Sequence, residues 1–492
     1  MTHDGAFANR ALAAALERAP QLSPPERGLA TELVYGVLRR RARLDRALDA
    51  VATRGLAVAE NVRNVLRVGA YQLLFLDRIP AYAAVDDTVE TMKREHGARL
   101  AGLANALLRR LAERGEPTLP DPARDARAYL RDACGFPGWM AELCLRELGP
   151  ARAVALGMAS GEVPPLALRA NPLAPAAPPD ASPIVRHAPP DTTAADGTPP
   201  AASPGAADVQ PDAQPDRQAF DHAAAPLTAS PVPREALRDA LAAERPGATL
   251  ALSPVAPDAL LARGLDAPAT TAAFARGAFA IEDVGAQVVA ALCGAAPGER
   301  ILDACAGLGG KTAHLAALAG NGATIDALDL SAAKLRQAEE QWTRLGARGI
   351  TVRVADLTRD FPAETAPYQR VLLDAPCSGL GVLRRHPEVL LRRTEADVTL
   401  LAATQRRMLD VVAPLVAPGG ILVYAVCTFD RAEGEDVVAS FLAAHPDFVP
   451  APPPVSNIDW SRLAAGAPHL IRLWPDRDDA DAFFAARLQR RS

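Results

Sequence analysis

A chain of 492 residues exceeds the length of about 250–300 residues at which a single hydrophobic core stops growing, so two or three domains are expected. The six cysteines include no close CxxC pair, which fits neither a disulfide framework nor a zinc site, and no run approaches the ~18 apolar residues of a membrane span. These features predict a soluble cytoplasmic protein without a metal ion or a membrane partner.

The net charge of −5 is unevenly distributed along the chain. Residues 174–231 carry seven Asp and two Arg, whereas residues 1–120 carry eighteen Lys and Arg against fourteen Asp and Glu. The densest basic cluster, RRRAR at Arg39 to Arg43, could follow a phosphate backbone. The alternative for this cluster is an ordinary solvated helix face.

Residues 1–125 are predicted to form an all-α domain. Between Asn9 and Leu111, apolar residues recur every three or four positions, which is the period of amphipathic helices. Pro24, Gly55 and Pro80 interrupt this pattern where helices are expected to end or begin.

Residues 126–277 are predicted to form a small α+β linker domain that carries a disordered insertion. Residues 174–231 contain thirteen prolines and one aromatic residue, so they cannot bury enough apolar area to offset their chain entropy. A plain interdomain linker is the alternative. The helical pattern PREALRDALAAE, which follows at Pro233 to Glu244, favours an insertion within one folded unit.

Residues 278–492 are predicted to form an α/β domain. The apolar runs RILDACA, ATIDALDL, RVLLDAPC and GILVYAVCTF alternate with amphipathic helical segments, which indicates a parallel sheet covered on both faces. Ligands of such sheets bind beyond the carboxyl ends of the strands.

The segment DACAGLGGKT, Asp303 to Thr312, joins the first of these strands to a helix. A phosphate-binding P-loop would need glycine at Cys305, and a dinucleotide fingerprint starting at Gly307 would need a third glycine at Thr312. The segment therefore fits neither motif, and a simple glycine-rich turn is the alternative to a ligand-binding loop.

Three aspartates close successive strands at the same predicted edge. Asp329 could accept hydrogen bonds from ribose hydroxyls, Asp356 could meet an adenine edge, and Asp374 ends the fourth strand. Each aspartate alone fits an ordinary loop or helix cap, but the three together predict a nucleoside site. S-adenosylmethionine suits this site because it carries adenosine and a sulfonium but no phosphate.

Cys377 and Cys427 each end an apolar strand at this edge, whereas Cys134, Cys144, Cys293 and Cys305 are typical of core packing. The segments DACAGLGGKT, DAPCSGLG and YAVCTF resemble the nucleotide-binding, proline-cysteine and threonine-cysteine motifs of RNA cytosine-5 methyltransferases. The helical start, with LANALLRRL, is similar to the NusB-like domain of the Sun/Fmu (RsmB-type) branch, which modifies 16S ribosomal RNA.

The resemblance implies a Rossmann-like class I methyltransferase domain that uses S-adenosylmethionine and forms a covalent cysteine-cytosine intermediate. It makes Cys427 the nucleophile that attacks carbon 6 of cytosine, and it gives the release step to Cys377. Asp374 would stabilise cytosine N3, and Lys311 occupies the lysine position of the motif near the cofactor loop. The residues implied to bind the cofactor are Cys305, Ala306, Gly307, Leu308, Gly309, Gly310, Lys311, Asp329, Asp356 and Asp374.

The resemblance also implies a monomer whose substrate is 16S ribosomal RNA. The alternatives are a transfer RNA cytosine-5 methyltransferase and a non-catalytic RNA-binding or antitermination factor that has kept an idle fold. Two departures from the family pattern stand out. Gly307 and Leu308 replace an alanine and a proline, which predicts a less preorganised cofactor loop, and Glu282 stands where glutamine is common.

Overall fold

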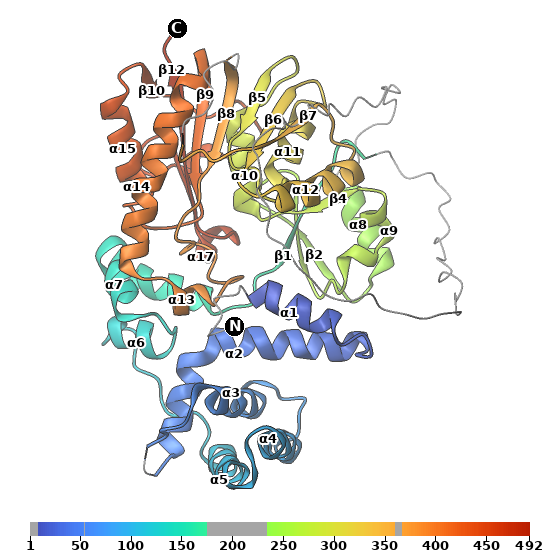
Figure 1. Cartoon of the computed structure of the whole chain (residues 1–492), viewed down its shortest axis with the longest axis vertical. Helices are drawn as coiled ribbons and strands as arrows, with labels where there is room; N and C mark the ends of the chain where they lie inside the picture. Colours follow the sequence, from blue (N-terminus) through green and yellow to red (C-terminus); the bar gives the residue numbers. More distant parts are fainter. Residues whose placement is uncertain (1–7, 54, 175–233, 360–366) are drawn as a thin grey trace, which may run out of the picture.

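The computed structural model describes residues 8–53, 55–174, 234–359 and 367–492 (Figure 1). The predicted insertion at 174–231 lies outside these ranges except for Ala174. That residue is 5% exposed and packs in the core of the small domain, so the folded part of this domain continues through Ala174, where the insertion was predicted to begin.

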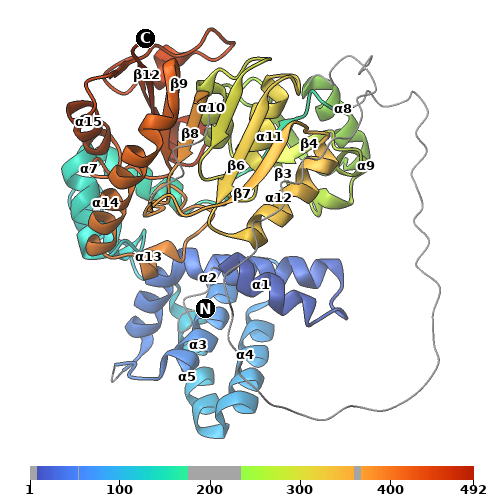
Figure 2. The ribbon, with the colours of Figure 1, turned by 45° about the horizontal axis from the view of Figure 1, so that its top comes forward.

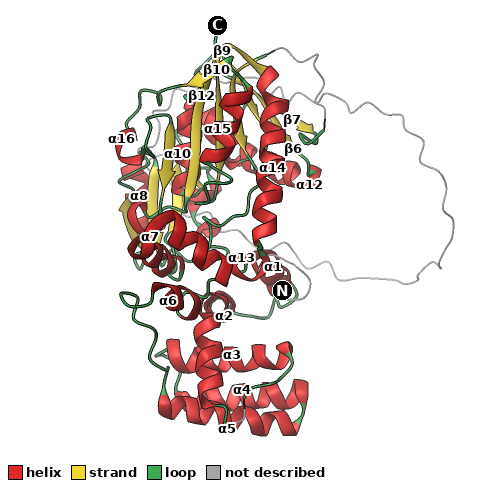
Figure 3. Cartoon of the chain, turned by 90° about the vertical axis from the view of Figure 1, so that its left-hand side faces the viewer, coloured by secondary structure: helices red, strands yellow, loops and turns green. Residues whose placement is uncertain are grey.

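Five helices build the described part of the N-terminal domain, as the apolar periodicity predicted. In Figure 3, α3, α4 and α5 lie at the bottom of the view, with α2 and α1 above them. The second helix begins at Pro24, where the carboxylate of Glu26 accepts the backbone N–H of Ser23 at 2.8 Å. Gly36 allows α2 to approach α3 closely, because a Cβ there would lie 2.1 Å from the Tyr71 ring. The helices are α1 (Ala8–Glu17), α2 (Pro24–Val51), α3 (Glu60–Phe75), α4 (Ala81–His96) and α5 (Ala98–Arg114).

Helices α6 (Ala126–Asp132) and α7 (Gly138–Ser160) were predicted to belong to the small α+β domain. They pack instead against the C-terminal domain, because Met140 and Leu143 of α7 share one core cluster with Leu383, Phe429 and Trp474. The sequence pattern showed that these helices have an apolar face, but not which domain covers it.

The small domain has a four-stranded antiparallel sheet in the order β2-β3-β1-β4. Strand β4 pairs with β1, so this sheet extends beyond the predicted boundary at residue 277. A buried ion pair, Arg169 Nε to Glu282 Oε2 at 2.6 Å, joins β1 to the residue that follows β4. The elements are β1 (Leu166–Ala170), α8 (Arg234–Glu244), β2 (Thr249–Leu252), β3 (Ala259–Arg263), the 3-10 helix η1 (Pro268–Thr270), α9 (Ala272–Ala275) and β4 (Phe279–Ile281).

The C-terminal domain is built on one large sheet in the order β10-β12-β9-β8-β5-β6-β7, with β11 paired to β12. The five strands from β5 to β9 are parallel, as predicted, and the strands after them are antiparallel. The strands are β5 (Arg300–Asp303), β6 (Thr324–Asp329), β7 (Ile350–Val354), β8 (Tyr368–Asp374), β9 (Val416–Val426), β10 (Phe448–Pro450), β11 (Leu470–Leu473) and β12 (Phe483–Arg490).

Helices cover both faces of this sheet. Ile301 and Leu372 pack with α10 and α11 on one face, whereas Leu302 and Leu373 pack with α14 and α15 on the other. This alternation of neighbouring residues is the period of a strand with two buried faces. The helices are α10 (Val284–Cys293), α11 (Gly310–Leu318), α12 (Ala332–Leu345), α13 (Val389–Arg392), α14 (Glu395–Val412), the 3-10 helix η2 (Ala413–Leu415), α15 (Glu435–Ala444), α16 (Trp460–Leu463) and α17 (Pro475–Asp478).

Figure 2 shows α1 and α2 lying between the α3–α5 helices and the C-terminal domain. The Arg39 side chain of α2 donates two hydrogen bonds to the Arg384 carbonyl, at 2.9 and 3.1 Å. The Ala8 backbone N–H at the start of α1 donates to Glu388 Oε1 at 3.1 Å. The N-terminal domain is therefore joined to the loop that follows the proline-cysteine motif.

Candidate active site

The two strand-end cysteines meet at the carboxyl edge of the large sheet. Cys377 follows β8 and Cys427 follows β9, and these strands pair in parallel. The two Sγ atoms lie 3.2 Å apart, and both residues are partly exposed. The hydrogen bond with Cys427, burial, and the charges of Glu433 and Asp374 raise the pKa of the Cys377 thiol. The two sulfurs therefore lie side by side at the edge where ligands of such sheets bind.

Lys311 and Asp374 form an ion pair at the same edge. Lys311 lies in the first turn of α11, and its Nζ is 2.6 Å from Oδ2 of Asp374 at the end of β8. Burial lowers the pKa of Lys311, but the negative charges of Asp374, Glu282 and Asp303 outweigh it and raise this pKa overall. Lys311 thus stays an ammonium that balances several carboxylates around the cofactor loop.

Asp303 ends β5 and is buried beneath the loop. Its Oδ2 accepts a hydrogen bond from Thr312 Oγ1 at 2.7 Å, while Oδ1 has no partner among the described residues. Burial raises the pKa of Asp303 to about 6, and the hydrogen bond from Thr312 offsets only part of this shift. Thr312, which breaks the dinucleotide pattern, therefore links the end of the strand to the start of α11.

Residues 304–309 form the turn between β5 and α11. Gly307 and Gly309 have φ angles of 59° and 77°, a conformation that glycine adopts most easily. At Gly309 a Cβ would lie 2.4 Å from Nε1 of Trp342, whose indole N–H donates to the Gly309 carbonyl at 2.8 Å. A Cβ at Gly307 would meet nothing closer than the Cys305 carbonyl at 4.0 Å. The turn is thus fixed from the α12 side and open above Gly307.

Asp329 connects the end of β6 to this turn. Its Oδ2 accepts the Gly307 N–H at 3.0 Å, its Oδ1 accepts the Ser331 N–H at 2.8 Å, and Lys334 Nζ lies 3.8 Å from Oδ1. A carboxylate offers about four acceptor positions, so ribose hydroxyls could still donate to it. This geometry fits the predicted ribose contact of Asp329, which stays a prediction.

Asp356 lies two residues beyond the end of β7. Its Oδ1 accepts both the backbone N–H and the hydroxyl of Thr358, at 2.9 and 2.6 Å. These hydrogen bonds lower the pKa of Asp356. The arrangement is that of a loop cap, which was the alternative for this residue, and its contact with adenine stays a prediction.

Large apolar side chains stay exposed along this edge, on both sides of Asp329. The exposed fractions are 58% for Leu308, 68% for Leu330 and 59% for Val354. An adenine ring needs apolar contacts on its faces, and these residues could supply them to S-adenosylmethionine. A simple loop cap would not require exposed apolar side chains at these positions. Sequence reasoning missed Leu330 and Val354. The available signals were an apolar residue directly after the strand-end Asp329 and, for Val354, an apolar residue at the end of β7.

Sequence reasoning also missed a buried polar network behind the cysteines. Ser378 donates through its backbone N–H and its hydroxyl to the carboxylate of Glu433, and its hydroxyl lies 3.2 Å from Thr428 Oγ1. Gln405 Nε2 donates to Glu433 Oε1 at 2.9 Å. The position of Glu433, four residues beyond the end of the threonine-cysteine motif at Phe429, was the signal for this contact.

Comparison with known proteins supports the geometry. Residues 290–489 match the family model described as 16S rRNA methyltransferase RsmB/F, and residues 1–113 match the NusB family. Ribosomal RNA small subunit methyltransferase B of Pseudomonas putida is 31% identical to this chain, over 94% of this chain and 90% of that protein. The chain belongs to the RsmB/F 16S rRNA methyltransferase family.

Two further comparisons agree with this family and with the fold. Ribosomal RNA small subunit methyltransferase B of Vibrio cholerae is 31% identical, over 87% of this chain and 83% of that protein. The crystal structure of the protein PH0851 superposes with a TM-score of 0.71 at 21% identity, covering 97% of this chain and 93% of that chain. The predicted resemblance, the NusB-like domain, the Rossmann-like methyltransferase fold and the use of S-adenosylmethionine are thus confirmed. The roles of single residues stay predictions.

In this RsmB/F family member, the basic cluster at Arg39 to Arg43 is occupied by internal contacts. Its arginines are partly buried and contact other groups of the same chain. The contacts join Arg39 to the Arg384 carbonyl at 2.9 Å, Arg41 to Glu60 at 2.8 Å, Arg43 to Glu116, and Arg40 to the Phe75 ring at 5.7 Å from its centroid. These guanidinium groups have a structural role, which neither alternative for this cluster included.

The remaining cysteines support the packing interpretation. Cys144 and Cys293 are buried, and Cys134 and Cys305 are partly buried. Burial raises the pKa of all four thiols, which disfavours their reactive thiolate form. Cys305 therefore contributes to the cofactor turn through its backbone position more than through its thiol.

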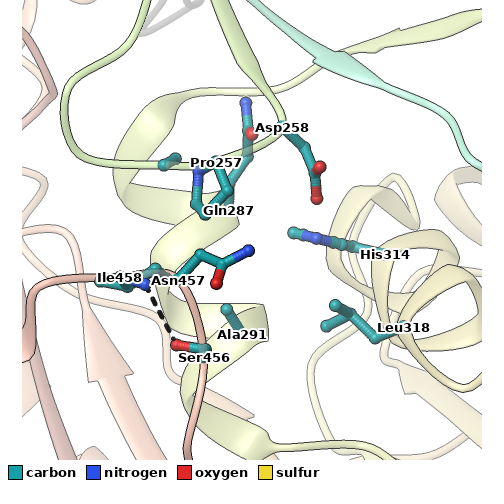
Figure 4. A pocket seen from close by; sticks show the side chains of 10 residues that line it. Pro257, Asp258, Gln287, Ala291, His314, Leu318, Ser456, Asn457 and Ile458 are labelled. Carbon is teal, nitrogen blue, oxygen red and sulfur yellow. Dashed lines mark hydrogen bonds between the residues drawn. The ribbon is translucent and has the colours of Figure 1, made fainter. Parts of the chain in front are cut away.

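A separate cavity of about 280 Å³ is shown in Figure 4. Its lining includes Gln287 of α10, His314 of α11 and Asp258 of the small domain, and none of the predicted site residues. Within the described ranges, no group of three or more His, Cys, Asp and Glu residues could hold a metal ion. In the same part of the chain, no helix is long and apolar enough to cross a membrane.

Proposed function

We propose that the protein methylates carbon 5 of one cytidine in 16S ribosomal RNA, as a cytoplasmic monomer, through covalent attachment to Cys427. The observation that carries this proposal is the 3.2 Å separation of the Cys377 and Cys427 sulfurs at the cofactor edge of an RsmB/F family member. Two groups this close can act on carbon 5 and carbon 6 of one pyrimidine ring, because these carbons are bonded neighbours.

Cys427 carries out the first step. Carbon 5 of cytosine is too weak a nucleophile to accept a methyl group unaided, so a covalent bond that divides the barrier is needed. The Cys427 thiolate adds to carbon 6, and the electron pair of the ring double bond becomes available at carbon 5. S-adenosylmethionine, when bound, supplies an electrophilic methyl group for that carbon.

Asp374 and Lys311 would stabilise the charge that develops on the cytosine ring. A carboxylate 2.6 Å from an ammonium accepts hydrogen bonds rather than donating them, so Asp374 would accept from a protonated N3 or from the exocyclic amino group of cytosine. Lys311 keeps this carboxylate charged and in place. The negative charge that the ring gains on thiolate addition is then offset by a proton that N3 takes up from water, and N3 returns this proton to water when Cys427 leaves carbon 6.

Cys377 carries out the release. After its own proton has left to water, its thiolate takes the proton from carbon 5. The electrons of that bond re-form the ring double bond, and the bond between Cys427 and carbon 6 breaks with its electron pair returning to Cys427. The product is 5-methylcytosine, and Cys377 returns to the thiol form.

Bisulfite sequencing tests the substrate and the position. A strain that lacks the gene should lose protection at a single 16S cytidine, and the purified protein with S-adenosylmethionine should restore it on 16S RNA. Protection of a transfer RNA cytidine instead would replace 16S RNA as the substrate. No change at any cytidine, together with no binding of S-adenosylmethionine in calorimetry, would overturn the proposal.

A further inference from the structure

Glu433 makes an unusual set of contacts for a buried carboxylate. It is 0% exposed, and its Oε1 accepts the Ser378 N–H at 2.8 Å and Gln405 Nε2 at 2.9 Å, while its Oε2 contacts the Ser378 hydroxyl. No arginine or lysine forms an ion pair with Glu433 among the described residues. Burial raises the pKa of Glu433, although these hydrogen bonds oppose the shift.

An unpaired buried carboxylate is expensive, because its hydration is lost without an opposite charge to compensate. An apolar residue or a glutamine would fill the same space at lower cost. Such a local conflict with stability is typical of functional sites. The location of Glu433 is therefore informative, since it contacts the residue that follows Cys377.

Side chains from other elements hold four backbone polar groups around Cys377. Gln405 Nε2 donates to the Pro376 carbonyl at 3.0 Å, and Arg393 donates to the Cys377 and Ser378 carbonyls at 3.4 and 2.8 Å. The remaining group, the Ser378 N–H, is held by Glu433. Removal of Glu433 would leave the Ser378 N–H without its anchor while the three carbonyl contacts remain.

The same carboxylate connects the two cysteine segments. Glu433 lies in the loop that continues from Cys427, and it contacts Ser378, whose hydroxyl lies 3.2 Å from Thr428 Oγ1. Thr428 and Ser378 directly follow the two cysteines. Any shift in this bridge moves one segment against the other and changes the separation of the two sulfurs.

We propose that Glu433 is a positioning residue that holds Cys377 against Cys427, and that its negative charge keeps the last proton of the thiol pair on the Cys377 sulfur. The proposal makes the two cysteines unequal in how readily they lose a proton. It rests on the proposed function only for the catalytic role of this difference. A proton kept on Cys377 prevents this sulfur from competing with Cys427 for carbon 6.

The charges near Cys377 support this difference between the two thiols. The charges of Glu433 and Asp374 both act on the Cys377 thiol, in addition to its hydrogen bond with Cys427 and its burial. Like charges near a thiol disfavour its thiolate, so removal of Glu433 should make Cys377 easier to deprotonate. The geometric part of the proposal does not depend on this charge, so the two parts can be separated experimentally.

Glu433→Gln separates charge from geometry. The glutamine oxygen can accept from the Ser378 N–H and from Gln405, and its amide nitrogen can donate to the Ser378 hydroxyl, which can then donate to Thr428. Alkylation by iodoacetamide, resolved for each cysteine by mass spectrometry across a pH series, reports which thiol loses its proton first. We expect the midpoint for Cys377 to fall by about one pH unit in Glu433→Gln, with melting temperature retained.

Glu433→Ala removes charge and geometry together. We expect kcat to fall about 100-fold in this variant, with KM values for RNA and S-adenosylmethionine unchanged, because misplaced reacting groups slow chemistry more than binding. Glu433→Gln should recover most of this loss at neutral pH and show a displaced pH profile. Glu299→Ala is the matched control, since Glu299 pairs with Arg370 before the amino end of β5, away from the cysteines.

The outcomes are distinguishable. An unchanged Cys377 midpoint in Glu433→Gln would overturn the charge role, and a wild-type kcat in Glu433→Ala would overturn the positioning role. If Glu433→Ala does not fold, the Gln variant still decides the charge role. Glu433→Asp, which keeps the charge but shortens the reach to Ser378, then decides the positioning role, and a wild-type kcat in that variant would overturn it. Alkylation needs neither RNA nor cofactor, so it remains informative if the substrate proves not to be 16S RNA.

Discussion

Two polar regions of the molecule contrast in how they use their side chains. The arginines from Arg39 to Arg43 form the densest positive charge in the N-terminal domain, yet they contact carbonyls, carboxylates and a ring of the same chain. At the edge around Cys377 and Cys427, both cysteine residues are partly exposed. Partly exposed reactive groups, rather than the density of charge, thus distinguish the candidate site.

The contacts of the basic cluster indicate a role in joining domains rather than in binding RNA. Arg39 donates to the Arg384 carbonyl in the loop that follows the proline-cysteine motif. The cluster therefore joins the NusB-like domain to the catalytic domain. We expect RNA contacts of the N-terminal domain to come from exposed cations elsewhere, such as Lys93 and Arg99 on the α4–α5 hairpin, which have no side-chain partner among the described residues.

The largest effect is expected at the two cysteines, which should fail in different ways. Cys427→Ala cannot form the bond to carbon 6, so turnover should fall by at least about 1000-fold while binding of RNA and cofactor persists. Cys377→Ala should attack and methylate but not release, which leaves protein attached to RNA. A denaturing gel with labelled RNA should show a slow band for Cys377→Ala only.

The double variant is the control for that gel, and it should give no slow band. A band with Cys427→Ala instead would exchange the two roles. If neither variant traps RNA and both melt several degrees lower, the cysteines are structural, and the contrast between the two regions disappears.

Substitution of Lys311 tests whether the ion pair at the catalytic edge contributes more to the free energy of unfolding than an exposed ion pair does. Lys311→Met leaves Asp374 without its partner, and we expect a loss of unfolding free energy on the order of 3 kcal/mol, because the pair is largely buried. Urea unfolding measures this loss. Lys334→Met should cost at most about 0.5 kcal/mol, since Lys334 is 42% exposed and 3.8 Å from Asp329. Equal losses in the two variants would contradict the distinction.

Asp303 gives a pH-dependent test of the same edge. Its pKa is raised from 3.8 to about 6, so the folded protein binds a proton that the unfolded chain has already lost in this range. Stability from this residue is fully present below about pH 4 and is lost as the pH rises to about 6. Asp303→Asn mimics the protonated acid and should be more stable than wild type at pH 8, by on the order of 2 kcal/mol, and equal to it at pH 3.5.

Thermal unfolding at both pH values checks this expectation. A stability gain of equal size at pH 3.5 and pH 8 would show that the asparagine acts through packing rather than through charge. No gain at pH 8 would show that the buried carboxylate is already compensated, for example by Lys311.

The smallest expected effect separates exposed from occupied cations in the N-terminal domain. Lys93→Gln with Arg99→Gln should lower the slope of log Kd for RNA against log salt by about 2, since each lost phosphate contact releases about one ion fewer. Arg41→Gln should leave this slope unchanged, because Arg41 is already paired with Glu60. The reverse result would restore the basic cluster as the RNA contact.

The sequence by itself determined the elements and the edge of the sheet that carries the site. Apolar period and strand-end residues are local properties of the chain, so they placed Asp329, Asp374, Cys377 and Cys427 at the ends of β6, β8 and β9 without coordinates. The motifs at Asp303 to Thr312 and around the two cysteines indicated the family, because a motif is also a local property of the chain.

Only the tertiary structure decided which distant groups became partners. Glu433 contacts Ser378, 55 positions away, and Arg39 contacts the Arg384 carbonyl, 345 positions away. Helix α7 packs against the C-terminal domain. Such contacts depend on how the chain crosses between strands and how domains dock, and local propensity contains neither. A charged or apolar side chain shows that it needs a partner, but topology determines which partner it finds.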